Sequence, residues 1–270
     1  MTTKNNAPKI VTKPDKTFTI NLTLTTEEIN SGYQSTLKSI QSDFEIKGFR
    51  KGKAPLDVVK QNISESKVIE EVLSHLISHA YSHIITDNKL KPIIQPQVKI
   101  LNPPITLDKE WQVEITGCEL PETTLNPKYK DEVKKINLSK DDDNQKLTNI
   151  MESMVKNSKV DMPSILIKAD VEKKLADLVD QTQQAGLTVA QYLKNRQQTV
   201  EQYQASLEVQ VKNEWITNLA IDKIAKEEKL EVSQQEVDEL VNKNKQLAQN
   251  LNLVYYLLTQ QKVFEFLKKL

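Results

Sequence analysis

Residues 47–55 read Lys47-Gly48-Phe49-Arg50-Lys51-Gly52-Lys53-Ala54-Pro55, and this stretch decides how the rest of the sequence is interpreted. Two of the five glycines in the chain lie here, four residues apart. Glycine adopts backbone conformations that other residues avoid, so the chain can turn tightly at both ends of the stretch. Proline then stiffens the exit. A large aromatic ring among cations on such a loop suits an anionic surface better than a core.

The sequence around this loop predicts a small α+β domain. Alternation of apolar and polar residues indicates strands, and apolar residues at helical spacing indicate helices. Thr25 and Glu28 have the spacing of a capping box, which predicts a helix start. The expected elements are a strand at 17–25, a helix from Thr25 to about Asp43, a short helix after Pro55, a longer helix at about 65–87, and strands at 97–101 and 111–120. We therefore predict an antiparallel sheet with helices over residues 1–121.

Composition changes after residue 121. Residues 121–145 contain Pro121, Pro127 and the acidic run Asp141–Asp143 but few apolar residues, which predicts a linker over 122–144. From about residue 145 the strong signals are helical. Three further pairs have capping-box spacing, namely Thr188 with Gln191, Thr199 with Gln202, and Ser233 with Glu236. We predict an all-α domain over 145–270, so that the fold class of the whole chain is α+β.

Charge and cysteine content narrow the class of protein. Lys and Arg number 37, as do Asp and Glu, so attraction to an anionic partner must come from local clustering. The single cysteine, Cys118, and a polar N-terminus without the apolar core of a signal peptide favour a cytoplasmic location. The most apolar stretch, Leu251–Leu258, is too short to span a bilayer, so we expect no membrane partner.

The glycine loop resembles the signature of the bacterial trigger factor family, Gly-Phe-Arg-x-Gly-x-x-Pro. The fixed positions of that signature are matched by Gly48, Phe49, Arg50, Gly52 and Pro55. Further stretches resemble the family at 90–96, 160–163 and 185–193, so the resemblance covers nearly the whole chain except about 130–158. It implies a ribosome-binding α+β domain followed by an elongated all-α chaperone domain with arms.

The interval between the two predicted domains departs from the family pattern. Most trigger factors carry an FKBP-type prolyl isomerase domain there, whereas this chain has about 25 residues without glycine. An FKBP fold needs glycine-bearing turns and an aromatic-lined pocket. We therefore expect that the isomerase domain is missing, that the chain is not an enzyme, and that it has no catalytic residue and no cofactor.

The resemblance implies an ATP-independent chaperone that docks near the nascent-chain exit of the ribosome. Its partners would be the large subunit, through RNA and a tunnel-exit protein, and unfolded nascent polypeptides. The ribosome-binding residues would be Gly48, Phe49, Arg50, Lys51, Gly52, Lys53 and Pro55. The candidates for polypeptide binding are Met151, Met154, Tyr192, Val200, Tyr203, Leu251 and Leu253. For any single one of these, plain helix–helix core is the favoured interpretation, and a homodimer through the apolar helices is an open alternative.

Other interpretations stay open at this point. The loop could be an ordinary solvated turn, or it could serve a free RNA-binding protein, although the neutral overall charge argues against the latter. A reduced prolyl isomerase and a periplasmic chaperone are further alternatives. His75, His79 and His83 share one helix edge, and two such imidazoles can bind a metal. Because no further ligand is near them in sequence, we predict a polar helix flank and no metal site.

Overall fold

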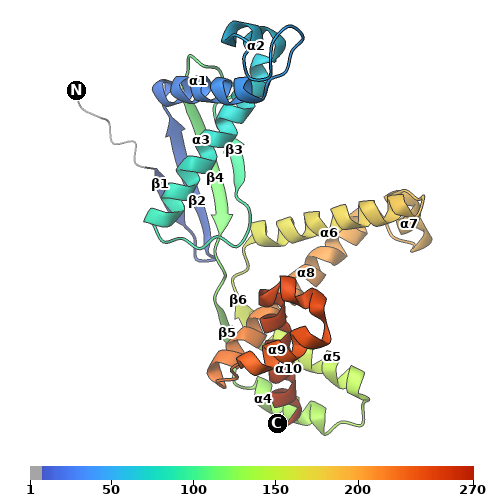
Figure 1. The fold of residues 1–270 in the computed structure, drawn as a ribbon. Helices are drawn as coiled ribbons and strands as arrows, with labels where there is room; N and C mark the ends of the chain where they lie inside the picture. The colour runs from blue at the N-terminus through green and yellow to red at the C-terminus, as the bar shows by residue number, and fades with distance from the viewer. Residues whose placement is uncertain (1–7) are drawn as a thin grey trace. The chain divides into compact units, whose positions relative to one another are not determined.

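The computed structural model describes residues 8–270 and divides the chain into two compact units, Met1–Leu120 and Pro121–Leu270. We refer to them as the N-terminal unit and the C-terminal unit and describe each by itself (Figure 1). The N-terminal unit holds a small antiparallel sheet with helices, and the C-terminal unit is mainly helical. The predicted α+β fold class is confirmed.

The sheet of the N-terminal unit has the strand order β1-β2-β4-β3, and all neighbours are antiparallel. Its strands are β1 (Lys9–Thr12), β2 (Thr17–Leu24), β3 (Gln97–Ile100) and β4 (Trp111–Cys118). Alternate side chains of β2 and β4 are buried on the same face, because Ile20 stands opposite Ile115 and Leu24 opposite Trp111. Strand β1 had no alternating signal long enough to be predicted.

Within residues 8–120 the sheet is accompanied by three helices, namely α1 (Thr26–Asp43), α2 (Leu56–Asn62) and α3 (Glu65–Asp87). Helices α1 and α3 lie against the sheet, and their apolar faces join β2 and β4 in one core (Figure 1). The predicted capping box of Thr25 and Glu28 is present, and such a cap contributes about 1 kcal/mol. The glycine loop therefore connects two helices of a packed unit.

The C-terminal unit consists of seven α-helices, a 3₁₀ helix and two short strands in the described part of the chain. They are β5 (Thr123–Leu125), α4 (Tyr129–Asn137), α5 (Asp143–Asn157), β6 (Ser158–Val160), α6 (Ser164–Gln184), α7 (Val189–Asn195), α8 (Val200–Glu227), α9 (Gln234–Lys243), the 3₁₀ helix Lys245–Gln249, and α10 (Leu251–Lys268). The three predicted capping boxes open α7, α8 and α9. Helix α6 is followed by Gly186, whose φ is +71°.

The prediction of a linker over 122–144 is wrong. The interval contains strand β5, helix α4 and the start of α5. The side chains of Tyr129 and Val133 on α4 are buried among residues of α5, α8 and α10. The expectation failed because a nine-residue helix shows only a weak apolar pattern, and because β5 pairs with β6 more than thirty residues away in sequence.

The C-terminal unit buries its apolar residues in separate clusters. One joins α4, α5, α8 and α10, a second lies between α6 and α8 around Val171 and Leu207, and a third joins α9 to α10 around Val237 and Val254. Helices α6 and α8 run side by side and form an arm with α7 at its far end (Figure 1). Within residues 8–270, no helix is both long enough and apolar enough to cross a membrane.

Candidate functional site

The glycine loop between α1 and α2 turns through two residues of positive φ. The φ angle is +99° at Gly48 and +74° at Gly52, a region that favours glycine. At Gly52 space is also restricted, because a Cβ atom there would stand 2.6 Å from the backbone oxygen of Ser42. At Gly48 an added Cβ would meet nothing within 4 Å. Gly52 is therefore required by its φ angle and by the nearby backbone of Ser42, whereas Gly48 is favoured by its φ angle alone.

Hydrogen bonds fix the loop to the end of α1. The N–H of Gly52 donates to the carbonyl oxygen of Phe44 at 3.0 Å. The Nε2 atom of Gln41 donates to the carbonyl oxygen of Ala54 at 2.7 Å, and Ala54 is fully buried. A further bond runs inside the loop, from the N–H of Lys53 to the carbonyl oxygen of Arg50 at 2.9 Å. The backbone of the loop is thus held in place, with Ala54 buried and the side chains of residues 49–51 and of Lys53 exposed.

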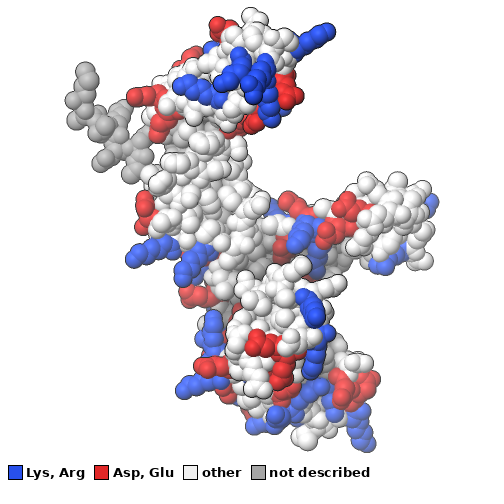
Figure 2. Space-filling model, viewed as in Figure 1, with Lys and Arg blue, Asp and Glu red and all other residues white. Residues whose placement is uncertain are grey.

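The exposed surface of the loop is aromatic and basic. Phe49 is 45% exposed, and the neighbouring cations Arg50, Lys51 and Lys53 are exposed as well. Lys51 lies 3.4 Å from the carboxylate of Asp43, but both side chains are solvated and such a pair is weak. Among the described residues no carboxylate forms an ion pair with Arg50 or Lys53. Figure 2 shows Lys and Arg side chains gathered over the end of the N-terminal unit that carries α2.

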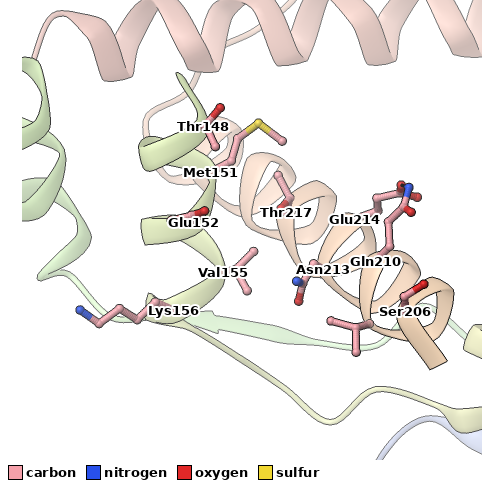
Figure 3. A pocket seen from close by; sticks show the side chains of 11 residues that line it. Thr148, Met151, Glu152, Val155, Lys156, Ser206, Gln210, Asn213, Glu214 and Thr217 are labelled. Atoms are coloured by element: carbon pink, nitrogen blue, oxygen red, sulfur yellow. Dashed lines mark hydrogen bonds between the residues drawn. The ribbon is translucent and has the colours of Figure 1, made fainter. Parts of the chain in front are cut away.

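A groove of about 620 Å³ lies between α5 and α8 in the C-terminal unit. Its apolar lining includes Met151 and Val155 on α5 (Figure 3). Val209 on α8 completes the apolar lining. The groove is also lined by polar and charged side chains, namely Thr148, Glu152, Lys156, Ser206, Gln210, Asn213, Glu214 and Thr217. An open groove with an apolar base and polar flanks can bind a flexible ligand without a unique set of hydrogen bonds.

One acidic side chain of this groove is held in place by two partners. Lys174 on α6 donates to both carboxylate oxygens of Glu214, at 2.8 and 3.0 Å, and Gln210 donates to one of them at 2.8 Å. Burial alone would raise the pKa of Glu214. The hydrogen bonds from Lys174 and Gln210 outweigh this effect and lower the pKa below its ordinary value. Glu214 therefore stays ionised and links α8 to α6.

The two predicted polypeptide-binding residues on α5 differ in exposure. Met151 is 39% exposed and lines the groove. Met154 is fully buried in the core with Tyr129 and Ile150. The prediction that Met154 offers surface for polypeptide binding is therefore wrong. Residues three apart on a helix lie only about 60° apart around its axis, so Met151 stands at the edge of the face of α5 that Met154 buries in the core.

Sequence reasoning missed Val155 and Val209, which also line the groove. Val209 is 61% exposed and stands between the buried residues Leu207 and Val211 of α8. The available signal was a β-branched apolar residue on the polar side of an amphipathic helix.

The other predicted residues lie apart from this groove. Tyr192 on α7 is half-buried, and the guanidinium of Arg196 stacks 4.6 Å from its ring. Tyr203 packs against the apolar cluster between α6 and α8. The exposed members of the set are Val200 at the start of α8 and Leu251 and Leu253 at the start of α10. The structure therefore does not gather the seven candidates into one site.

Within residues 8–270, the three histidines of α3 and Cys118 do not form a metal site or a reactive thiol site. His75, His79 and His83 are exposed on α3, and the rings of the last two lie 4.6 Å apart. No group of three or more potential metal ligands occurs within residues 8–270. Cys118 is fully buried, and burial raises the pKa of its thiol to about 11. As a neutral thiol it is packed in the sheet.

Comparison with known families identifies the chain. The N-terminal model of the bacterial trigger factor protein matches residues 9–151, and the C-terminal model of the same protein matches residues 124–269. The chain belongs to the bacterial trigger factor family. The two matches overlap between residues 124 and 151, so they leave no unmatched interval between the N-terminal and C-terminal trigger factor domains.

Several trigger factors are similar to the chain in sequence. The trigger factor of Clostridium botulinum (strain Hall) is 28% identical over 162 residues, which are 60% of this chain and 36% of that protein. The trigger factor of Bdellovibrio bacteriovorus is 31% identical over 122 residues, which are 45% of this chain and 26% of that protein. The matched part thus spans about a third or less of the length of these relatives.

The fold of a solved trigger factor structure agrees over nearly the full length. That structure comes from a study of promiscuous substrate recognition in folding and assembly by the trigger factor chaperone. The match has a TM-score of 0.63 and covers 97% of this chain and 99% of the other, at 11% sequence identity. At this identity the agreement concerns the fold.

Proposed function

We propose that this trigger factor is an ATP-independent chaperone that docks on the large ribosomal subunit through residues 48–55 and holds unfolded nascent polypeptides. The observation that carries the docking role is the half-exposed ring of Phe49 between cations on a loop fixed to α1. An ordinary solvated turn has no need for such a ring at its surface. Family membership supports the chaperone role.

The chemistry of the loop fits a surface of RNA and protein. The guanidinium of Arg50 can donate two parallel hydrogen bonds to a phosphate or a carboxylate, and Lys53 adds positive charge nearby. The ring of Phe49 can enter a shallow apolar depression beside the phosphates. Because the loop backbone is fixed before binding, little conformational entropy is lost when it docks.

Holding of unfolded chains is the role of the C-terminal unit in this proposal. Unfolded polypeptides of many sequences share only apolar side chains and backbone groups, so a receptor needs adaptable apolar surface. The groove between α5 and α8 provides it through Met151, Val155 and Val209. Val200, Leu251 and Leu253 are exposed apolar residues apart from the groove and would offer further contact points for an unfolded chain.

No enzymatic step, cofactor or membrane forms part of this proposal. We place the activity in the cytoplasm, where ribosomes release nascent chains. A homodimer in which apolar helical surface of one copy covers that of another is compatible with the proposal away from the ribosome.

Co-sedimentation with empty ribosomes tests the docking role. We expect the wild-type chain to sediment with ribosomes and the triple variant Phe49→Ala, Arg50→Ala, Lys51→Ala to remain in the supernatant. Empty ribosomes are used so that a nascent chain cannot recruit either protein. Equal sedimentation of wild type and triple variant would contradict the docking role.

A second triple variant serves as the matched control. Tyr192→Ala, Lys194→Ala, Arg196→Ala removes one aromatic ring and two cations from α7 and the residue that follows it, instead of from the loop. We expect it to sediment like the wild type. Binding of the wild type to arbitrary RNA as tightly as to ribosomes would instead favour a free RNA-binding protein.

A further inference from the structure

Strand β3 (Gln97–Ile100) forms one edge of the sheet in the N-terminal unit. It is last in the strand order β1-β2-β4-β3, so β4 is its sole strand neighbour among the described residues. An edge strand exposes a row of backbone donors and acceptors that can pair with another chain.

The register shows which backbone groups of β3 face away from β4. The N–H of Leu101 donates to the carbonyl oxygen of Gln112 at 2.8 Å, which makes these two residues a hydrogen-bonded pair. In an antiparallel ladder such pairs alternate with pairs whose N–H and C=O groups point away from each other. Val98 opposite Ile115 and Ile100 opposite Val113 are pairs of the second kind. The backbone N–H and C=O groups of Val98 and of Ile100 therefore point toward the free edge.

An apolar groove of about 430 Å³ lies beside this edge. Its edge side is formed by Pro96 and Val98. Its α3 side is formed by the apolar residues Leu73, Ile77 and Tyr81 together with Glu70, Ser74 and Ser78. The side chain of Val98 is 45% exposed, although it points to the same face of the sheet as the buried Ile115. A strand added next to β3 would continue the sheet, and every second side chain of it would enter this groove.

We propose that the free edge of β3 and the groove beside it form a second polypeptide-binding site, which takes an extended peptide segment with apolar side chains at alternate positions. Backbone hydrogen bonds to Val98 and Ile100 would supply affinity that does not depend on peptide sequence. The groove over α3 would select apolar side chains at every second position. The inference rests on the proposed holding of unfolded polypeptides and adds a site outside the C-terminal unit.

A second copy of the chain is the less suitable occupant. Val98 and Ile100 face the edge, so a symmetric antiparallel pairing of two β3 strands can be centred on Lys99. The two Lys99 side chains would then stand directly opposite each other on one face, and like charges in that position are destabilising. A short edge strand with a lysine is a common protection against self-association. A peptide without a cation at that position avoids the repulsion.

Hydrogen exchange and modified peptides test the site on the full-length wild-type chain. The probe is a synthetic peptide of about ten residues that alternates valine with serine and threonine. On binding, we expect exchange of the Val98 and Ile100 amides to slow at least tenfold. We also prepare two N-methylated forms, with methyl groups at the odd or at the even positions. One of the two should lose at least tenfold in affinity, because N-methylation removes the donors that face β3.

Three variants separate backbone pairing from side-chain contact. Val98→Pro removes an N–H that faces the free edge and leaves the bonds to β4 intact, so we expect at least tenfold weaker peptide binding. Val98→Ala keeps the N–H and should lose only a few-fold. Thr12→Pro removes an outward N–H from the opposite edge strand β1, as the bond from Lys13 N–H to the Thr17 oxygen indicates, and should bind normally.

The outcomes distinguish this site from the general chaperone role. Unchanged exchange at Val98 and Ile100 in the presence of bound peptide, or equal binding of both N-methylated forms, would overturn the site. If an unfolded protein is held while Val98→Pro binds the peptide normally, the site fails and the proposed function stands. If the wild type holds neither the peptide nor an unfolded protein, the proposed function itself fails.

Discussion

At the scale of single residues, Gly48 and Gly52 show what a sequence motif reveals and what it does not. Two glycines flanking a short basic stretch predict tight turns at both ends, and both residues have positive φ. The sequence does not show that the backbone oxygen of Ser42 approaches Gly52 so closely, because this depends on how α1 ends. It likewise could not reveal that Met154 is buried while Met151, one turn away, is exposed.

Alanine substitutions should separate the two glycines. At Gly48 alanine meets only the unfavourable φ, so we expect a loss of about 1 kcal/mol in the free energy of unfolding. At Gly52 it also meets the oxygen of Ser42, and we expect a loss of about 3 kcal/mol. Urea unfolding of the N-terminal unit can be followed through the buried Trp111 in a Trp215→Phe background. Equal losses for Gly48→Ala and Gly52→Ala would contradict the close contact.

Glu236 in the capping box of α9 should make stability depend on pH. Its pKa is lowered from about 4.5 to about 2, first by the hydrogen bond from Lys262 and then by those from the backbone and side chain of Ser233. A carboxyl group whose pKa is lowered in the folded state contributes stability above its unfolded pKa. That contribution is lost as the pH falls from about 4.5 to about 2.

The matched variant for this prediction is Glu236→Gln, which keeps the shape of the capping box but has no titrating group. We expect the wild type to be more stable than Glu236→Gln at pH 7. The difference should shrink as the pH falls below about 4.5, as measured by thermal unfolding at a series of pH values. A difference that is the same at pH 7 and pH 2.5 would rule out this role for the carboxylate.

At the scale of elements, the sequence predicts what local signals encode. Capping boxes open α1, α7, α8 and α9 where they were expected, because each depends on residues only three apart. Strands β1, β5 and β6 were missed because the apolar residues of β1 are adjacent and β5 and β6 contain one apolar residue each, whereas the equally short β3 alternates. Helix α4 was missed because its burial depends on α8 and α10, which are distant in sequence.

A pair of substitutions tests whether α4 belongs to the core. Val133 on α4 is fully buried, whereas Leu138 just beyond it is 86% exposed. We expect Val133→Ala to lower the free energy of unfolding of the C-terminal unit by about 2 kcal/mol. Leu138→Ala should change it by less than about 0.5 kcal/mol. Circular dichroism during urea unfolding measures both, and a silent Val133→Ala would restore the linker interpretation.

At the scale of the whole molecule, the basic loop and the groove between α5 and α8 lie on different units. The basic loop is in the N-terminal unit, and the groove between α5 and α8 is in the C-terminal unit. The loop motif is local in sequence, so its residues alone indicate the family. The groove was only partly predictable, because the exposure of Met151 and Val209 depends on how α5 packs against α8.

Salt should therefore affect the two proposed activities differently. If the loop neutralises about four phosphates, affinity for empty ribosomes should fall on the order of a hundredfold between 50 and 200 mM salt. Holding of an unfolded protein depends on apolar burial and should change by less than about threefold. Sedimentation and light scattering of an aggregating client measure the two effects. A parallel decline of both would mean that holding also depends on charge.

The pairing of β5 with β6 indicates where extra sequence can be inserted into the chain. Since these strands are hydrogen-bonded neighbours, the segment between them, which contains α4 and α5, begins and ends at almost the same point. Extra sequence inserted into the exposed turn at 138–141 would lengthen the segment between β5 and β6 without shifting the start of α6. A small reporter protein inserted there should leave the arm of α6 and α8 in its native register.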